Sequence, residues 1–187
     1  MFRFRLKGAL SPALPALLSV VFVGQAFGQH SIVRNSDLPS PILCAEVSGE
    51  MLPEDRQKKL AGVWLVNDEQ IIEIRVAKDK TISSASIRWD EKSQGFATDI
   101  ESLLVRQIGD QLVLFVRSKQ EGGDVFWFFR MEESEKGFSL FLPSAESFEK
   151  DAKALDILKV TPKFNEKLRA KDSFGMTNPI TLVRVLR

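Results

Sequence analysis

From Val63 onward, apolar and polar residues alternate in a series of short segments separated by turn residues. Ile72 and Ile74 share one face of an early segment, while Glu73 and Arg75 share the other. A period of two residues is typical of a β-strand that buries one face. Short alternating segments joined by tight turns indicate neighbouring antiparallel strands. The pattern therefore predicts an antiparallel meander.

The number of these segments predicts how the meander ends. About eight or nine of them follow one another, which favours a closed up-and-down barrel of about eight strands. Residues 125–129 are apolar at every position, so we expect both faces of that strand to be covered. In residues 96–108 the apolar register shifts near Glu101, and we attribute the shift to a β-bulge. The expected fold is mostly β, in one antiparallel barrel.

Short helices flank or interrupt the predicted strands. Pro53 and the two acids after it predict a short helix before Gly62, because proline suits a first helical position and acids complement the positive helix end. Ser144 and Thr161 are suitable N-caps for two further short helices ahead of the last strand. Residues 179–187 combine helical and strand spacing, and their β-branched content favours a strand.

The chain begins like an exported protein. Residues 1–28 hold a basic start and a long apolar run that ends in small residues, which predicts a signal peptide removed before Gln29. A retained membrane anchor is the alternative, because the run is nearly long enough to span a bilayer. Residues 29–50 are expected to form an extended linker, and 51–187 the barrel domain. We therefore expect a periplasmic or secreted protein with no membrane span after cleavage.

Charge and cysteine usage exclude several classes of partner. Without residues 1–28, Lys and Arg fall from 26 to 23 against 25 acids, for a net charge of −2. No basic patch is visible, so nucleic acid is not an expected partner. Cys44 is the only cysteine, which excludes an intramolecular disulfide. We expect a free or buried thiol, with a disulfide-linked dimer or mixed disulfide as the alternative; a lipid anchor is rejected because Cys44 lies well beyond the apolar run.

Gly62, Val63 and Trp64 stand at the start of the first predicted strand, just after the short helix. A Gly-x-Trp in this place resembles the signature of the lipocalin and fatty-acid-binding (calycin) superfamily. The resemblance implies that an arginine of the last strand lies across the tryptophan and closes one barrel end, and Arg184 is placed to do this. The layout also resembles small uncharacterised secreted bacterial proteins whose barrel is interrupted by helices. The chain has no tyrosine, so the Thr-Asp-Tyr motif of classical lipocalins is absent.

The sequence offers little for catalysis. The only histidine is His30, in the predicted linker, so the barrel domain holds no histidine for a Ser-His-Asp, Cys-His or His-rich zinc arrangement. Neither EF-hand spacing nor a phosphate-cradling glycine loop is present. We therefore expect no enzyme, no metal site and no cofactor.

Two functions remain, and the aromatic residues bear on both. The first is a lipocalin-like carrier, in which four aromatic side chains line the barrel interior and bind a small apolar or amphipathic ligand: Trp89, Phe115, Trp127 and Phe129. In the second, the same aromatics fill the interior, since an eight-stranded barrel is just wide enough for side chains alone. The chain would then be a non-catalytic scaffold whose outer face or linker binds another envelope or secreted protein.

Overall fold

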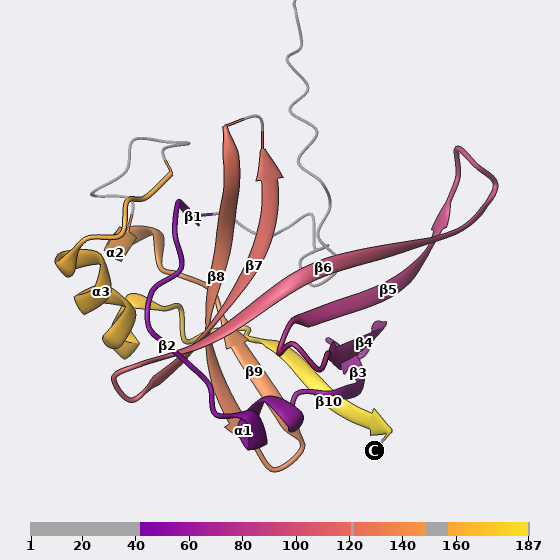
Figure 1. Ribbon diagram of the computed structural model, residues 1–187, viewed down its shortest axis with the longest axis horizontal. Coiled ribbons are helices and arrows are strands. Elements are labelled where there is room, and N and C mark those ends of the chain that lie inside the picture. The colour runs from indigo at the N-terminus through magenta and orange to yellow at the C-terminus, as the bar shows by residue number, and fades with distance from the viewer. Residues whose placement is uncertain (1–41, 121, 149–156, 187) are drawn as a thin grey trace, which may run out of the picture.

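The computed structural model describes residues 42–120, 122–148 and 157–186 (Figure 1). The predicted signal peptide, the first part of the predicted linker and His30 lie outside these ranges. Eight strands form the main sheet: β3 Gly62–Val66, β4 Gln70–Val76, β5 Ile82–Asp90, β6 Gly95–Ile108, β7 Gln111–Gln120, β8 Gly123–Ser134, β9 Gly137–Phe141 and β10 Ile180–Leu186.

The eight strands close into a barrel. Each pairs antiparallel with the next along the chain, and β10 then returns to pair with β3. This confirms the predicted single antiparallel up-and-down barrel. The ambiguous C-terminal stretch is the strand β10, because its β-branched residues fit between β3 and β9.

The short helices lie where the capping residues predict them. They are α1 Glu54–Lys58, α2 Ala145–Phe148, α3 Pro162–Arg169 and the 3₁₀ turn η2 Lys171–Ser173. Thr161 is the N-cap of α3, and its side chain accepts a hydrogen bond of 3.1 Å from the backbone N–H of Phe164. α2, α3 and η2 stand between β9 and β10 in the chain, as the sequence predicts.

Two further strands precede the barrel. β1 Leu43–Cys44 pairs with β8, and β2 Glu50–Met51 pairs with β6. On β8, β9 pairs only with residues 130–134. The same edge of β8 is therefore open in its first half, where β1 pairs with it. The described part of the predicted linker 29–50 is therefore packed on the barrel, and the folded domain begins before residue 51. The sequence could not indicate this, because the pairing residues lie far along the chain.

The protein has two apolar cores on opposite sides of β7 and β8. The inner core fills the barrel and includes Trp64, Ile72, Leu114, Phe129 and Leu140. The outer core lies between the outer faces of β7 and β8 and the covering elements β1, α2 and α3 (Figure 1). It includes Phe115, Phe126, Phe128, Phe148, Phe164 and Leu168. This confirms that both faces of residues 125–129 are covered.

The predicted bulge near Glu101 is wrong. β5 and β6 pair without a break, from Ile82 opposite Leu103 to Asp90 opposite Gly95. The apolar register shifts for another reason: the apolar side chains of β6 lie on its outer face before Glu101 and on its inner face after it. A strand that changes its apolar face needs no extra residue, because its two halves have different surroundings.

Candidate binding surface

Trp64 closes one end of the barrel. Its ring is buried, and its Nε1 donates a hydrogen bond of 2.8 Å to the carbonyl of Leu60, in the turn after α1. The guanidinium carbon of Arg184 lies 4.3 Å from the centroid of the Trp64 ring, as the superfamily resemblance implies. Arg184 also donates hydrogen bonds to the carbonyls of Ala61 and Lys59. The indole, the guanidinium and the chain after α1 thus form one plug, which is structural.

Glycine is required at two places beside this plug. Gly62 has a φ of +144°, which disfavours any residue with a Cβ. A Cβ on Gly137 would lie 1.9 Å from the carbonyl oxygen of Leu182 and 3.1 Å from the Trp64 ring. Gly62 therefore serves the turn into β3, and Gly137 serves the close approach of β9 to the plug. Neither residue lines a ligand site.

The plugged half of the barrel is filled. A void of about 20 Å³ remains between its walls, among side chains that include Leu60, Leu103, Met131, Phe138 and Leu182. Such a void holds about one water molecule, whereas ligand pockets span roughly 300–1,000 Å³. This part of the interior therefore has no room for an apolar ligand.

The four aromatic residues predicted to line the interior do not lie together. Phe129 and the half-buried Trp127 belong to the inner core. Phe115 is buried on the other side of β7, in the outer core, with its ring centroid 6.4 Å from that of Phe128. Trp89 lies on the outer face of β5 and is 51% exposed. The interior placement of Phe115 and Trp89 is therefore wrong, because alternation groups residues by face without saying which face is inside.

The inner face of β5 and β6 is polar where Ser84 pairs with Glu101. Ser84, Ser86 and Glu101 are buried there, and the Ser84 hydroxyl lies 3.4 Å from a carboxylate oxygen of Glu101. Burying hydroxyl and carboxylate groups costs free energy that apolar side chains would not cost. β5 nevertheless turns its polar side inward and its apolar side outward.

Beyond this point β5 and β6 leave the barrel as a two-stranded ribbon. β4 pairs with β5 only as far as Ser86, and β7 pairs with β6 only from Leu103 onward. Residues 87–102, called the ribbon here, contain β-strand pairs between β5 and β6 only, within the described chain. Figure 1 shows the ribbon extending away from the barrel, on the side opposite α2 and α3.

The outer side of the ribbon carries four large, exposed apolar side chains, which we call the ribbon face. Their exposed fractions are 69% for Ile87, 51% for Trp89, 78% for Phe96 and 73% for Ile100. Trp89 and Phe96 face each other across the two strands, with ring centroids 5.3 Å apart and planes at 81°. Thr98 lies between Phe96 and Ile100 on the same side, so the ribbon face carries no charged residue.

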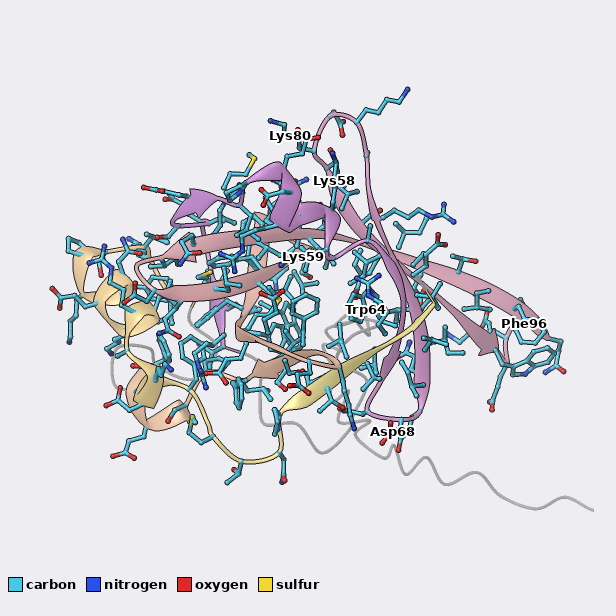
Figure 2. The ribbon with its side chains drawn as sticks, turned by 90° about the horizontal axis from the view of Figure 1, so that it is seen from below. Lys58, Lys59, Trp64, Asp68, Lys80 and Phe96 are labelled. Atoms are coloured by element: carbon cyan, nitrogen blue, oxygen red, sulfur yellow. The ribbon has the colours of Figure 1, made fainter. Side chains whose placement is uncertain are left out.

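The ribbon face stands apart from the barrel end that Trp64 closes. Figure 2 shows Phe96 near the free end of the ribbon, away from Trp64. Ile71 of β4 precedes the last β4–β5 pair, Ile72 with Ser86, and its side chain is 60% exposed on the outer face of β4. It extends the apolar surface toward the barrel. Contiguous exposed apolar surface of this kind marks interaction sites in proteins that fold correctly. The change of apolar face at Glu101 was the sequence signal for this surface.

Cys44 is part of the covered side of the molecule. Its side chain is fully buried in the outer core, and its Sγ lies 3.3 Å from the carbonyl oxygen of Glu46. Burial raises the pKa of the Cys44 thiol to about 12. The buried-thiol prediction is therefore confirmed, and a thiol in this place is neither a nucleophile nor accessible for a disulfide between chains.

A buried arginine fixes the layer that covers β8. The guanidinium carbon of Arg130 lies 4.1 Å from the centroid of Phe141 and 6.0 Å from that of Phe174. The same group forms an ion pair with Glu132 and contacts the sulfur of Met176. Arg130 therefore joins β8 to β9 and to the segment after η2, and it explains how a charge is kept inside the outer layer.

A polar hollow of about 490 Å³ lies near α1 and the end of β8. Its walls include Arg56, Glu133 and Lys171. Glu133 lies 3.9 Å from Arg56 and 3.5 Å from Lys59, so its charge is matched within the chain. Mutually paired surface charges of this kind need no ligand.

Comparison with known protein families, with curated proteins and with solved structures finds no match for this chain. Within residues 42–120, 122–148 and 157–186, no group of three or more His, Cys, Asp or Glu side chains is placed to hold a metal ion. In the same ranges no helix has the length and apolar character needed to cross a membrane. The strongest candidate for a functional site is the ribbon face, because it exposes four large apolar side chains on one uncharged surface.

Proposed function

We propose that the chain is a non-catalytic, lipocalin-like barrel that acts as a scaffold and docks another protein on its ribbon face. The observation that carries the proposal is the outward turn of Ile87, Trp89, Phe96 and Ile100, at 51–78% exposure, on a ribbon that projects from the barrel. Water contact with four large apolar side chains on one face is unfavourable, and a docked protein removes it.

The composition of the ribbon face suits a protein partner. Trp and Phe are enriched in protein interfaces, whereas charged residues are depleted at interface centres. Trp89 and Phe96 form a ready-made aromatic pair, and aromatic anchors of this kind commonly supply most of the binding free energy. Nearer the barrel, Ser84 and Ser86 are buried on the inner face of β5, whereas Ile87 and Trp89 of the same strand face outward.

Small-ligand carriage is the weaker candidate. The void of about 20 Å³ in the plugged half argues against it, and only Trp127 and Phe129 of the four expected lining residues belong to the inner core. Native mass spectrometry of the protein from its own source tests this directly. We expect a mass without bound lipid and no binding of a fluorescent fatty acid; an excess mass removed by organic extraction would restore the carrier hypothesis.

The partner class follows from the expected export of the chain. If residues 1–28 direct export, the ribbon face meets proteins of the periplasm or the extracellular space. The docked protein is then an envelope or secreted protein. This part of the proposal depends on cleavage before Gln29, which N-terminal sequencing of the protein from its source tests.

Photo-crosslinking tests the docking surface. A benzoylphenylalanine in place of Thr98, which lies among the ribbon-face side chains, is expected to form a protein adduct in the native source. The same group in place of Asp110, exposed in the β6–β7 turn, is the control and should form none. Equal yields of protein adduct at both positions, or none at Thr98, would contradict the proposal.

A further inference from the structure

We infer that the protein docked on the ribbon face is a second copy of this chain, packed face to face about a two-fold axis. The inference rests on the proposed use of this face for docking and names its occupant. A two-fold contact brings the same patch from both copies together, so the patch must be complementary to itself. Charge, shape and area each meet this requirement.

Charge is the first requirement. The ribbon face itself is uncharged, and each of its two ends carries both acidic and basic residues. The free end has Asp90, Glu91 and Lys92, for a net charge of −1. The end near the barrel has Glu73 and Arg75 on the same outer side of β4, paired at 2.6 Å, for a net charge of zero. A two-fold axis that lies in the interface and perpendicular to the strands lays the free end of one copy over the barrel end of the other. Each contact then brings a group of net charge −1 over a group of zero net charge, which avoids repulsion between like net charges.

Shape is the second requirement. At the free end the Trp89–Phe96 pair forms a ridge of two rings. At the barrel end Ala85 stands opposite Ile100, so that end offers a small residue and one aliphatic side chain. Turning a copy end for end places its aromatic ridge over the Ala85 position of the other copy, and the reverse contact forms at the same time. Large side chains that oppose small ones interdigitate in this way when sheets pack face to face.

Area is the third requirement. From their exposed fractions, the four ribbon-face side chains offer about 500 Å² of surface per copy, or about 1,000 Å² in a dimer. Specific interfaces begin near that size, and small ones bind weakly. Ile71 and Ala85 add to the contact from the barrel side. The area is at the low end for a specific interface, so it fits a reversible dimer and not an obligate one.

Sedimentation equilibrium of the full chain purified after export, over a wide micromolar range, tests the inference. We expect a reversible monomer–dimer equilibrium. Phe96→Asp and Trp89→Asp, on the two strands of the ribbon, should each weaken dimerisation at least tenfold while thermal unfolding changes little. Met51→Asp is the matched control, because Met51 is 55% exposed but lies on β2, and it should dimerise like the wild type.

A complementation experiment tests the two-fold arrangement. The proposed packing places Phe96 of one copy over Ile100 of the other. Chains with Phe96→Lys alone and chains with Ile100→Asp alone should be monomers, whereas an equal mixture should form a one-to-one dimer through the new ion pair. A mixture that stays monomeric while the wild type dimerises would overturn this packing.

The outcomes separate the inference from the function beneath it. A wild-type chain that remains monomeric at the highest concentration overturns the second copy as occupant. If Thr98 then crosslinks to a different protein, the docking function stands with another partner. If Thr98 crosslinks to nothing, both proposals fail. An adduct of twice the chain mass, together with the dimer in solution, supports both.

Discussion

Two hairpins of this barrel have apolar outer faces, and the described residues cover only one of them. On β7–β8, Phe115 and Phe128 lie beneath α2 and α3, and the ring of Phe128 contacts those of Phe148, Phe164 and Phe174 at 5.2–6.3 Å. On β5–β6, the ribbon face has no such layer in the described chain. Figure 1 places the two hairpins side by side in the sheet, with the helices beside only one of them.

The two hairpins differ in whether other segments of the described chain cover their apolar outer faces. The segment between β9 and β10 supplies the helices and three phenylalanines that cover β7–β8. No described segment does the same for the ribbon face, although its side chains are as apolar. We therefore interpret the first face as a core and the second as a binding surface.

Thiol reactivity should separate the two faces most strongly. In the variant Thr98→Cys, the new thiol stands on the ribbon face while Cys44 stays in the outer core. At neutral pH and low protein concentration, we expect Cys44 to react with Ellman's reagent about a thousandfold more slowly, from its pKa of about 12 against an ordinary value of 9.0. Burial slows it further. Comparable rates for the two thiols would contradict the burial of Cys44 beneath the outer core.

Truncation of one ring on each face should separate them in stability. Phe128→Ala removes a fully buried ring in contact with several others and should lower the free energy of unfolding by about 3–5 kcal/mol. Phe96→Ala removes a ring that is 78% exposed and should change it by less than about 0.5 kcal/mol. Urea unfolding of the monomeric chain measures both. A large loss for Phe96→Ala would mean that the ribbon face belongs to the fold.

The free energy of unfolding should depend on pH through Cys44, which is buried in the outer core that covers β7–β8. Because the folded-state pKa is raised, the thiol favours the folded state fully below pH 9, and this contribution is lost as pH rises toward 12. At pH 10 the loss should be about 1.4 kcal/mol. The control Cys44→Ala keeps every lysine, and the chain has no tyrosine, so the difference between the two slopes isolates the thiol. Identical slopes would contradict the buried thiol.

Dye binding should show the smallest difference, confined to the exposed face. The wild-type chain at low concentration should raise the fluorescence of anilinonaphthalene sulfonate, because the dye adsorbs on exposed apolar surface. Phe96→Asp should reduce this signal several-fold with little change in thermal unfolding, whereas Met51→Asp should leave it close to wild type. If Phe96→Asp gave the same fluorescence as the wild type, the dye would bind a surface other than the ribbon face.

The sequence allowed the barrel to be predicted because local patterns decide most of it. Alternation marked the strands, Pro53 and Thr161 marked two helix starts, and Gly62 with Trp64 marked the plugged end. These signals depend only on residues that are neighbours along the chain, so the rest of the fold does not alter what they predict. The partner of Trp64 on the last strand, Arg184, followed from the superfamily resemblance.

The binding surface could not be predicted in the same way. Alternation grouped Trp89 with Ile87, but whether that face points into the barrel depends on where β4 and β7 stop pairing. The predicted interior position of Phe115 was wrong for a related reason. Both faces of β7 are apolar, and the helices that cover its outer face come later in the chain. The pairing of β1 with β8 could not be predicted from the sequence either. It depends on β9 pairing with only the second half of β8, which leaves the first half of that edge to β1.

Hydroxyl-radical footprinting measures the solvent exposure of both hairpins in one experiment. In dilute purified protein, we predict strong modification of Trp89 and Phe96 and almost none of Phe128. In the native source, or at a concentration where the docked state forms, Trp89 and Phe96 should become protected while Phe128 stays unchanged. If Trp89 and Phe96 are modified to the same extent in every condition, the ribbon face binds no protein and the account is contradicted.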